Sequence, residues 1–494
     1  MRFTSRSKPK VGEYREEVGR AVQTNRRLGI TMLLGLALEI GWLAPRLAGQ
    51  AANAPPRKFT LEQAVNYALQ NYPAVRAAME RIQAAQGRTD LARTNYLPSS
   101  NLLWQSNRAT ANNIFGLLLP QGVVPSISGP VLPAASNRSV WGSAAGVLLS
   151  WEPFDFGYRR ATVDAAHRGE NITRSQADLT RLDVAATAAR AFFSLLAAEQ
   201  VAQAAQSNVK RWEVFDKSVR VLVDNELRPG ADASRADAEL AVARTQWIQA
   251  QTSVRVSRAA FADILGMSGT NIEVDAGALL TSLPEESLPA IPAASHPAAA
   301  IEQAQVEQVK AQERALERSF VPRFFTQAAL SGRGSGANPD GALAPGLNGL
   351  GLERMNYAAG ITVTFPVFDY FSNRAEKKIA AANQRSEQSR YAQTLQDLSE
   401  QVEQARAELD GAKSVAENTP IELQAARAGE TQSRARYQAG LATIVEAAQA
   451  EDLLVQAEID DALARLNVWR SLEGVAAAQG DLQPFVKLLS RAAP

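Results

Sequence analysis

The sequence predicts a mainly α-helical protein with a small β part, built as two copies of one unit. Two very long runs are rich in helix-forming Ala, Gln, Glu and Arg, and two short segments alternate apolar with small or polar residues, each preceded by a candidate partner strand. A series of landmarks also recurs in the same order in the two halves of the chain. The low aromatic content of 6% fits long helices better than a thick globular core.

The composition excludes several functional classes. The chain has 494 residues, 52 Lys+Arg against 51 Asp+Glu, no Cys and two His. A near-zero net charge disfavours a nucleic-acid partner, and the absence of Cys removes disulfides, thiolate metal sites and Cys nucleophiles. His167 and His296 are far apart, and neither has a carboxylate cluster around it. We therefore expect no enzyme active site, no metal site and no cofactor.

Residues 1–54 resemble a secretory signal peptide with an extended basic n-region. An Arg- and Lys-rich start precedes the apolar run 28–44, and small residues follow it. The long basic region and Glu39, which interrupts the apolar run, leave a retained membrane anchor as the alternative. Beyond this leader the chain is mildly acidic and has no apolar stretch long enough for a transmembrane helix.

The landmarks define a first structural repeat at 59–290 and a second at 295–480, followed by a C-terminal tail at 481–494. Each repeat reads as short helices, strand, loop, strand, very long helix, tight turn and return helix. The landmark pairs are 71–75 with 295–299, 154–161 with 368–375, and 228–230 with 438–440.

The predicted long helices cover about 157–223 and 372–438, and at 1.5 Å per residue each is about 100 Å long. Pro420 is expected to kink or locally unwind the second. Return helices are predicted at 231–265 and 441–478, and a shorter helix at 297–320. Narrow Ala and Leu stripes favour antiparallel coiled-coil packing of these helices.

Strands are predicted at about 99–108, 140–151, 324–331 and 355–365, with connecting loops at 109–139 and 332–352. Two of these strands carry an apolar face with aromatic residues near the ends, as in membrane barrels. The aromatic residues are Trp141, Trp151, Tyr357 and Phe365. They are membrane-interface anchors if the strands cross a bilayer, and core residues of an ordinary half-buried sheet if they do not. Four strands cannot close a barrel, so strands in a membrane require several chains to share one.

The chain resembles the TolC family of outer-membrane efflux proteins over nearly all of residues 59–485. The resemblance rests on the opening segment 59–73, the strand end Phe365-Pro-Val-Phe-Asp369 and the turn Arg436-Tyr-Gln-Ala-Gly-Leu441, together with the duplication. It implies a homotrimer whose twelve pooled strands form one outer-membrane barrel, continued by an α-helical tunnel through the periplasm. It also implies docking to a periplasmic adaptor (membrane fusion protein) and an inner-membrane transporter, and outer-membrane localisation with a large periplasmic portion.

This resemblance implies a passive channel for efflux or type I secretion, which opens when helix pairs untwist near the turns. In similar proteins an acidic ring follows the second turn, but here Gln449 stands where an Asp is usual. Entrance candidates are therefore Val445, Glu446, Gln449 and Asp452, with Glu451 nearby, although a solvated coiled-coil face explains these acids equally well. Gly230, Gly440 and Leu441 match turns where adaptors dock, while the glycines could simply permit a positive φ.

Two alternatives to the channel predict different sequence features. A periplasmic coiled-coil adaptor or scaffold without a pore would also combine export with long helical hairpins, but it does not need ten-residue strands with aromatic ends. A secreted helical enzyme needs site chemistry that the sequence lacks.

Overall fold

A computed structural model describes residues 57–110, 138–284, 287–338, 340, 342–366 and 369–492. The predicted signal peptide (1–54), most of the loop 109–139 and the landmark residue Phe368 lie outside these ranges. The described chain is mainly helical with a small sheet part, which confirms the predicted fold class.

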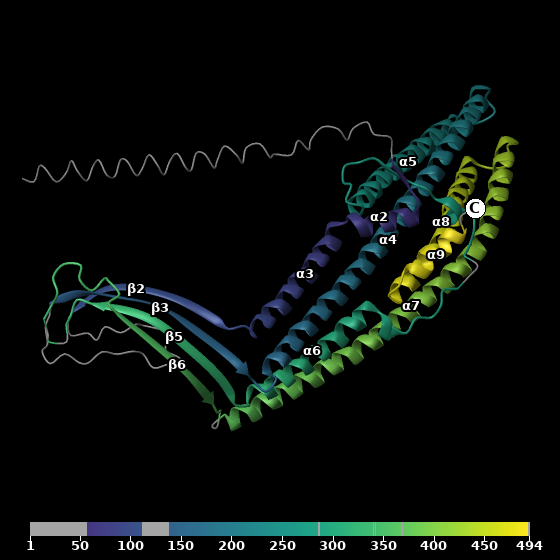
Figure 1. The fold of residues 1–494 in the computed structure, drawn as a ribbon. Helices are drawn as coiled ribbons and strands as arrows, with labels where there is room; N and C mark the ends of the chain where they lie inside the picture. Colours follow the sequence, from purple (N-terminus) through teal and green to yellow (C-terminus); the bar gives the residue numbers. More distant parts are fainter. Residues whose placement is uncertain are drawn as a thin grey trace, which may run out of the picture. The chain divides into compact units, whose positions relative to one another are not determined.

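Two very long helices dominate the structure. Helix α4 runs over Tyr158–Asp224 (67 residues) and α7 over Tyr370–Gln438 (69 residues). Each is followed by a 35-residue return helix, α5 (Gly230–Ile264) after α4 and α8 (Ile444–Ala478) after α7. The members of each pair contact each other and lie side by side in Figure 1.

Helix α7 continues through Pro420, so the expected local unwinding does not interrupt it. The neighbouring turns are held against α8. Leu423 packs with Leu454 and Ala457 in a buried cluster, and the Thr419 hydroxyl donates to a carboxylate oxygen of Asp461 at 3.4 Å. These tertiary contacts stabilise the helical conformation against the loss of one backbone hydrogen bond.

The shorter helices are α2 (Leu61–Asn71), α3 (Pro73–Thr94) and α6 (Pro297–Ser319), with 3₁₀ turns at Gly277–Leu280 and Ala293–Ser295. Pro73 and Pro297 occupy first helical positions, where a missing N–H costs nothing. His296 caps α6, because its Nδ1 accepts the backbone N–H of Ala298 at 3.0 Å.

The main sheet has four antiparallel strands in the order β2 (Ser99–Thr110), β3 (Ser139–Phe154), β5 (Arg323–Ser335) and β6 (Arg354–Thr364). Figure 1 shows the strands side by side as one curved sheet. In the described chain, β2 and β6 are its edge strands. Elsewhere, β1 (Arg57–Phe59) and β4 (Ile272–Val274) form a two-stranded parallel pair.

The largest hydrophobic core joins α2, α4, α5 and α8, and Phe192, Phe261 and Trp469 are fully buried in it. The segment 481–494, expected as a tail, instead contains helix α9 (Gln483–Ala492). The same core buries the side chains of Leu482, Phe485 and Val486. An isolated helix as short as α9 is marginal in water, and this apolar contact stabilises it.

Candidate functional site

One face of the four-stranded sheet is apolar and exposed. Alternate residues of each strand contribute to it, and the register carries it across all four strands. One such row consists of Leu102, Val147, Leu330 and Tyr357. Their exposed fractions are 83%, 40%, 56% and 86%, so each strand of the sheet presents an apolar side chain to its surroundings. A soluble protein rarely exposes a continuous apolar face of this kind.

The four predicted interface aromatics lie on or beside this face. Trp141 is half-buried near the loop end of β3, where the Arg108 guanidinium lies 5.7 Å from the centre of its ring. Trp151, near the helix end of the same strand, donates its indole N–H to the Tyr96 carbonyl at 3.1 Å. Tyr357 and Phe365 are exposed.

The opposite face of the sheet carries mainly small and polar side chains, with Val140 and Leu148 of β3 as buried apolar exceptions. Ala144, Ser331 and Gln327 are buried there, and charged residues lie towards its two ends. At the helix end, Arg323 makes a two-pronged ion pair with Glu152, with N–O distances of 2.8 and 2.7 Å. At the loop end, Arg333 and Arg354 occupy directly opposed positions on β5 and β6. A sheet that is apolar on one side and polar on the other suits a wall between lipid and water.

The two helical turns share one geometry. After α4, the N–H of Glu226 donates to the Val223 carbonyl and that of Leu227 to the Leu222 carbonyl. This pattern places a left-handed residue directly after the helix, and Glu226 has φ +58°.

After α7, the N–H groups of Gly440 and Leu441 donate in the same way to the Tyr437 and Arg436 carbonyls, and Gly440 has φ +79°. The structural equivalent of Gly440 is therefore Glu226, not Gly230. Gly230 is the first residue of α5 and does not have a positive φ, so the alternative that it simply permits a positive φ at the reversal was wrong. The left-handed residue of the first turn therefore lies four residues before Gly230, at Glu226.

The two turns are joined by the buried side chain of Tyr437. Its hydroxyl donates to a carboxylate oxygen of Asp232 at 2.9 Å, and the Arg228 guanidinium stacks 4.3 Å from its ring centre. The same guanidinium donates to the backbone carbonyls of Tyr437 and Ala442. Burial and the bond to Asp232 both raise the pKa of Tyr437, so the hydroxyl remains a donor. The first turn is thus bonded directly to the second.

Comparisons with known proteins agree with this geometry. The sequence pattern of outer membrane efflux proteins matches residues 64–267 and 293–481. The chain belongs to the outer membrane efflux protein family. This confirms the resemblance inferred from the sequence, and the family assignment supports outer-membrane localisation.

Individual efflux-family relatives are distant in sequence. Protein CyaE of Bordetella pertussis is 26% identical over 273 residues, which cover 50% of this chain and 52% of CyaE, so the match spans about half of that relative. The open-state Neisseria gonorrhoeae MtrE outer membrane channel has a TM-score of 0.66 at 20% identity, with 85% of this chain and 89% of MtrE covered. The Campylobacter jejuni CmeC outer membrane channel gives 0.67 at 16% identity, with 88% and 89% covered. These structures share the fold.

In this efflux-family chain the entrance candidates lie along one exposed strip of α8. Val445, Gln449 and Asp452 are all exposed, as is Glu446 beside them, whereas Ala447, Ala448 and Glu451 are buried. Glu446 has a local role, since it and Thr443 form a capping box with two contacts of 3.3 Å. Although Asp452 is exposed, neighbouring protein atoms partly desolvate its carboxylate, and this, followed by the nearby Glu239 carboxylate, raises the pKa of Asp452.

Glu451 points the other way and is only 4% exposed. It pairs with Arg211 of α4 and with Arg434 of α7, the latter at 3.2 Å. The acids near the second turn therefore have different roles. Asp452 lies on the exposed strip with Gln449, while Glu451 links α8 to α4 and α7.

Sequence reasoning missed two exposed residues of this efflux protein. Trp104 is 75% exposed on the apolar face of β2, and Leu227 is 69% exposed at the first turn, at the position that matches Leu441 (71%) at the second. Trp104 lies two residues after Leu102, so strand alternation places both on the same face and could have indicated Trp104. The match between Leu227 and Leu441 was missed because the sequence comparison aligned the two turns on Gly230 and Gly440. None of the described helices is both long and apolar enough to cross a bilayer.

Proposed function

We propose that this protein is the outer-membrane channel of a tripartite efflux or type I secretion system. The observation that carries the proposal is the four-stranded sheet, which exposes an apolar face, has two edge strands and continues into helices of 67 and 69 residues. Edge strands are not tolerated in lipid, so β2 of one chain must pair with β6 of another until the barrel closes. Twelve strands from three chains is the closed state we propose, and the repeated order of elements reflects an internal duplication.

The long helices then form a tunnel wall in the periplasm, and transport through it is passive. At about 1.5 Å per residue, α4 and α7 each extend about 100 Å from the barrel. The exposed α8 strip of Val445, Gln449 and Asp452 lines the inner entrance in this arrangement. The polar sheet face lines the barrel lumen, and the exposed aromatics contact lipid.

The partners that we propose are a periplasmic adaptor and an inner-membrane transporter. The exposed Leu227 and Leu441, at matching positions of the two turns, are the adaptor contacts, together with the neighbouring Gly440. The backbone of both turns is already fixed by hydrogen bonds, so binding through these leucines requires no ordering of the backbone.

The channel proposal is tested by reconstituting the full chain into planar bilayers. We expect discrete conductance steps, co-sedimentation with outer membranes and a trimer by mass in detergent. A water-soluble monomer that produces no conductance and does not bind lipid would contradict the proposal and favour the adaptor or scaffold alternative.

A further inference from the structure

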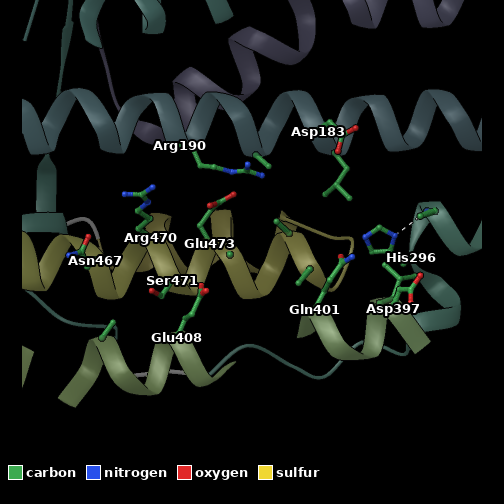
Figure 2. Close-up of a pocket in the computed structure, with 18 of the residues that line it drawn as sticks. Asp183, Arg190, His296, Asp397, Gln401, Glu408, Asn467, Arg470, Ser471 and Glu473 are labelled. Atoms are coloured by element: carbon green, nitrogen blue, oxygen red, sulfur yellow. Dashed lines mark hydrogen bonds between the residues drawn. The ribbon is translucent and has the colours of Figure 1, made fainter. Parts of the chain in front are cut away.

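A large cavity lies where α6 begins and α8 ends, between α4 and α7. Its volume is about 910 Å³, and all four helices contribute to its lining (Figure 2). Sites for small organic ligands typically measure roughly 300 to 1,000 Å³. The cavity is remote from both turns and from the sheet, so neither the entrance strip nor the lipid-facing surface accounts for it.

Glu473 of α8 is the unusual residue of this cavity. Its side chain is 1% exposed, and its Oε1 atom has no hydrogen-bond partner in the described structure. Figure 2 shows its carboxylate between the side chains of Arg190 and Arg470. Burial raises the pKa of this carboxyl to about 7, although both arginines act to lower it. A buried carboxylate oxygen without a hydrogen-bond donor is energetically costly. A ligand that places a donor at this point would remove that cost.

The charges around the cavity indicate what kind of donor fits. Its charged residues are the acids Asp183, Asp397, Glu408 and Glu473 and the bases Arg190 and Arg470. His296 adds no positive charge near neutral pH, because burial lowers its pKa. The lining therefore has an excess of carboxylates and favours a cation.

The uncharged part of the lining is mainly apolar, with the polar side chains of Thr394, Gln401, Asn467 and Ser471 interspersed. Leu179, Leu182, Leu398 and Val415 lie around the cavity with several alanines. No group of three acidic or His side chains in the described residues is arranged to hold a metal ion, so a bare divalent cation does not fit this pattern. An ammonium group on an apolar body matches both features, because its N–H groups can donate to a carboxylate while the body covers the leucines.

We propose that this cavity binds an amphiphilic organic amine, whose ammonium group donates a hydrogen bond to Glu473. The site requires only the packing of α4, α6, α7 and α8. Binding at this site and conduction through the channel are therefore separate properties, and either can fail without the other.

The test uses the full chain in detergent and dansylcadaverine, a primary amine joined to an apolar fluorophore. We expect saturable binding by fluorescence anisotropy, weakened at least ten-fold by Glu473→Gln, which keeps the shape of the side chain but removes its charge. The N-acetylated probe has no ammonium group and is expected to bind the unmodified chain at least ten-fold more weakly than dansylcadaverine.

Two further variants separate the site from non-specific uptake. Glu417→Gln removes an exposed charge from α7 outside the cavity and is expected to leave the affinity unchanged. Val415→Trp, at an exposed position of the lining, fills the cavity without disturbing the core and is expected to abolish binding. Equal affinities for all the variants, or for both probes, would show partition into detergent and overturn the proposal.

Discussion

Glu473 also provides a sharp prediction about stability. Its pKa of about 7 in the folded protein exceeds the ordinary value of 4.5, because the carboxylate is buried. Each pKa unit corresponds to about 1.4 kcal/mol, so the ionised carboxylate destabilises the fold by about 3 kcal/mol. The folded state binds the proton more tightly, and the cost therefore grows as the pH rises from 4.5 to 7 and stays constant above 7.

Replacing Glu473 by Gln removes this pH-dependent cost. We expect the variant to gain about 3 kcal/mol over the unmodified protein at pH 8 and less than about 1 kcal/mol at pH 5. An unsatisfied amide would lower both values equally, so the difference between the two pH values isolates the carboxyl. Urea unfolding of the full chain, followed by far-UV circular dichroism, measures the free energy of unfolding at each pH. Glu417→Gln serves as the control and should leave the free energy of unfolding unchanged at both pH values.

The same stability difference at both pH values would refute the reasoning. It would mean that Glu473 is ionised at its ordinary pKa, and that Arg190 or Arg470 pairs with it more closely than the structure shows. The hydrogen-bond vacancy in the cavity would then be absent, and the amine proposal would lose its main support.

Two other predictions concern conduction, and a third concerns adaptor binding. Tyr437→Phe removes the hydrogen bond to Asp232 but keeps the ring, so the link between the turns should weaken by about 1 kcal/mol and single-channel open probability should rise about five-fold. An unchanged open probability would show that this bond does not restrain the entrance. Leu227→Asp should weaken adaptor binding in pull-down assays by about ten-fold, and an equal loss of conductance would instead indicate misfolding. Arg354→Gln removes a positive charge from the polar face of the barrel, so the reversal potential in a salt gradient should shift towards cation preference; an unmoved potential would place Arg354 outside the ion path.

The sequence by itself determined which segments are helical and which alternate. The Pro-poor run that became α4, and the alternation from Met355 to Phe365 in β6, are local patterns that repeat every 3.6 or two residues. The spacing of side chains along a helix or strand follows from backbone geometry, so these patterns can be recognised without knowing the tertiary contacts. They therefore predicted the apolar sheet face before any contact was known, while the family followed from the segments 59–73, 365–369 and 436–441 together with the duplication.

Only the tertiary structure decided what individual residues do. The first turn forms at Glu226, and Arg228 beside it donates to carbonyls of the second turn. The roles of Glu451 and Asp452 depend on which helix each side chain faces. The segment after 481 became helical because the core accepts Phe485, and Glu473 lies at a cavity because four helices leave space there. These properties arise from contacts between distant parts of the chain, and no local pattern contains them.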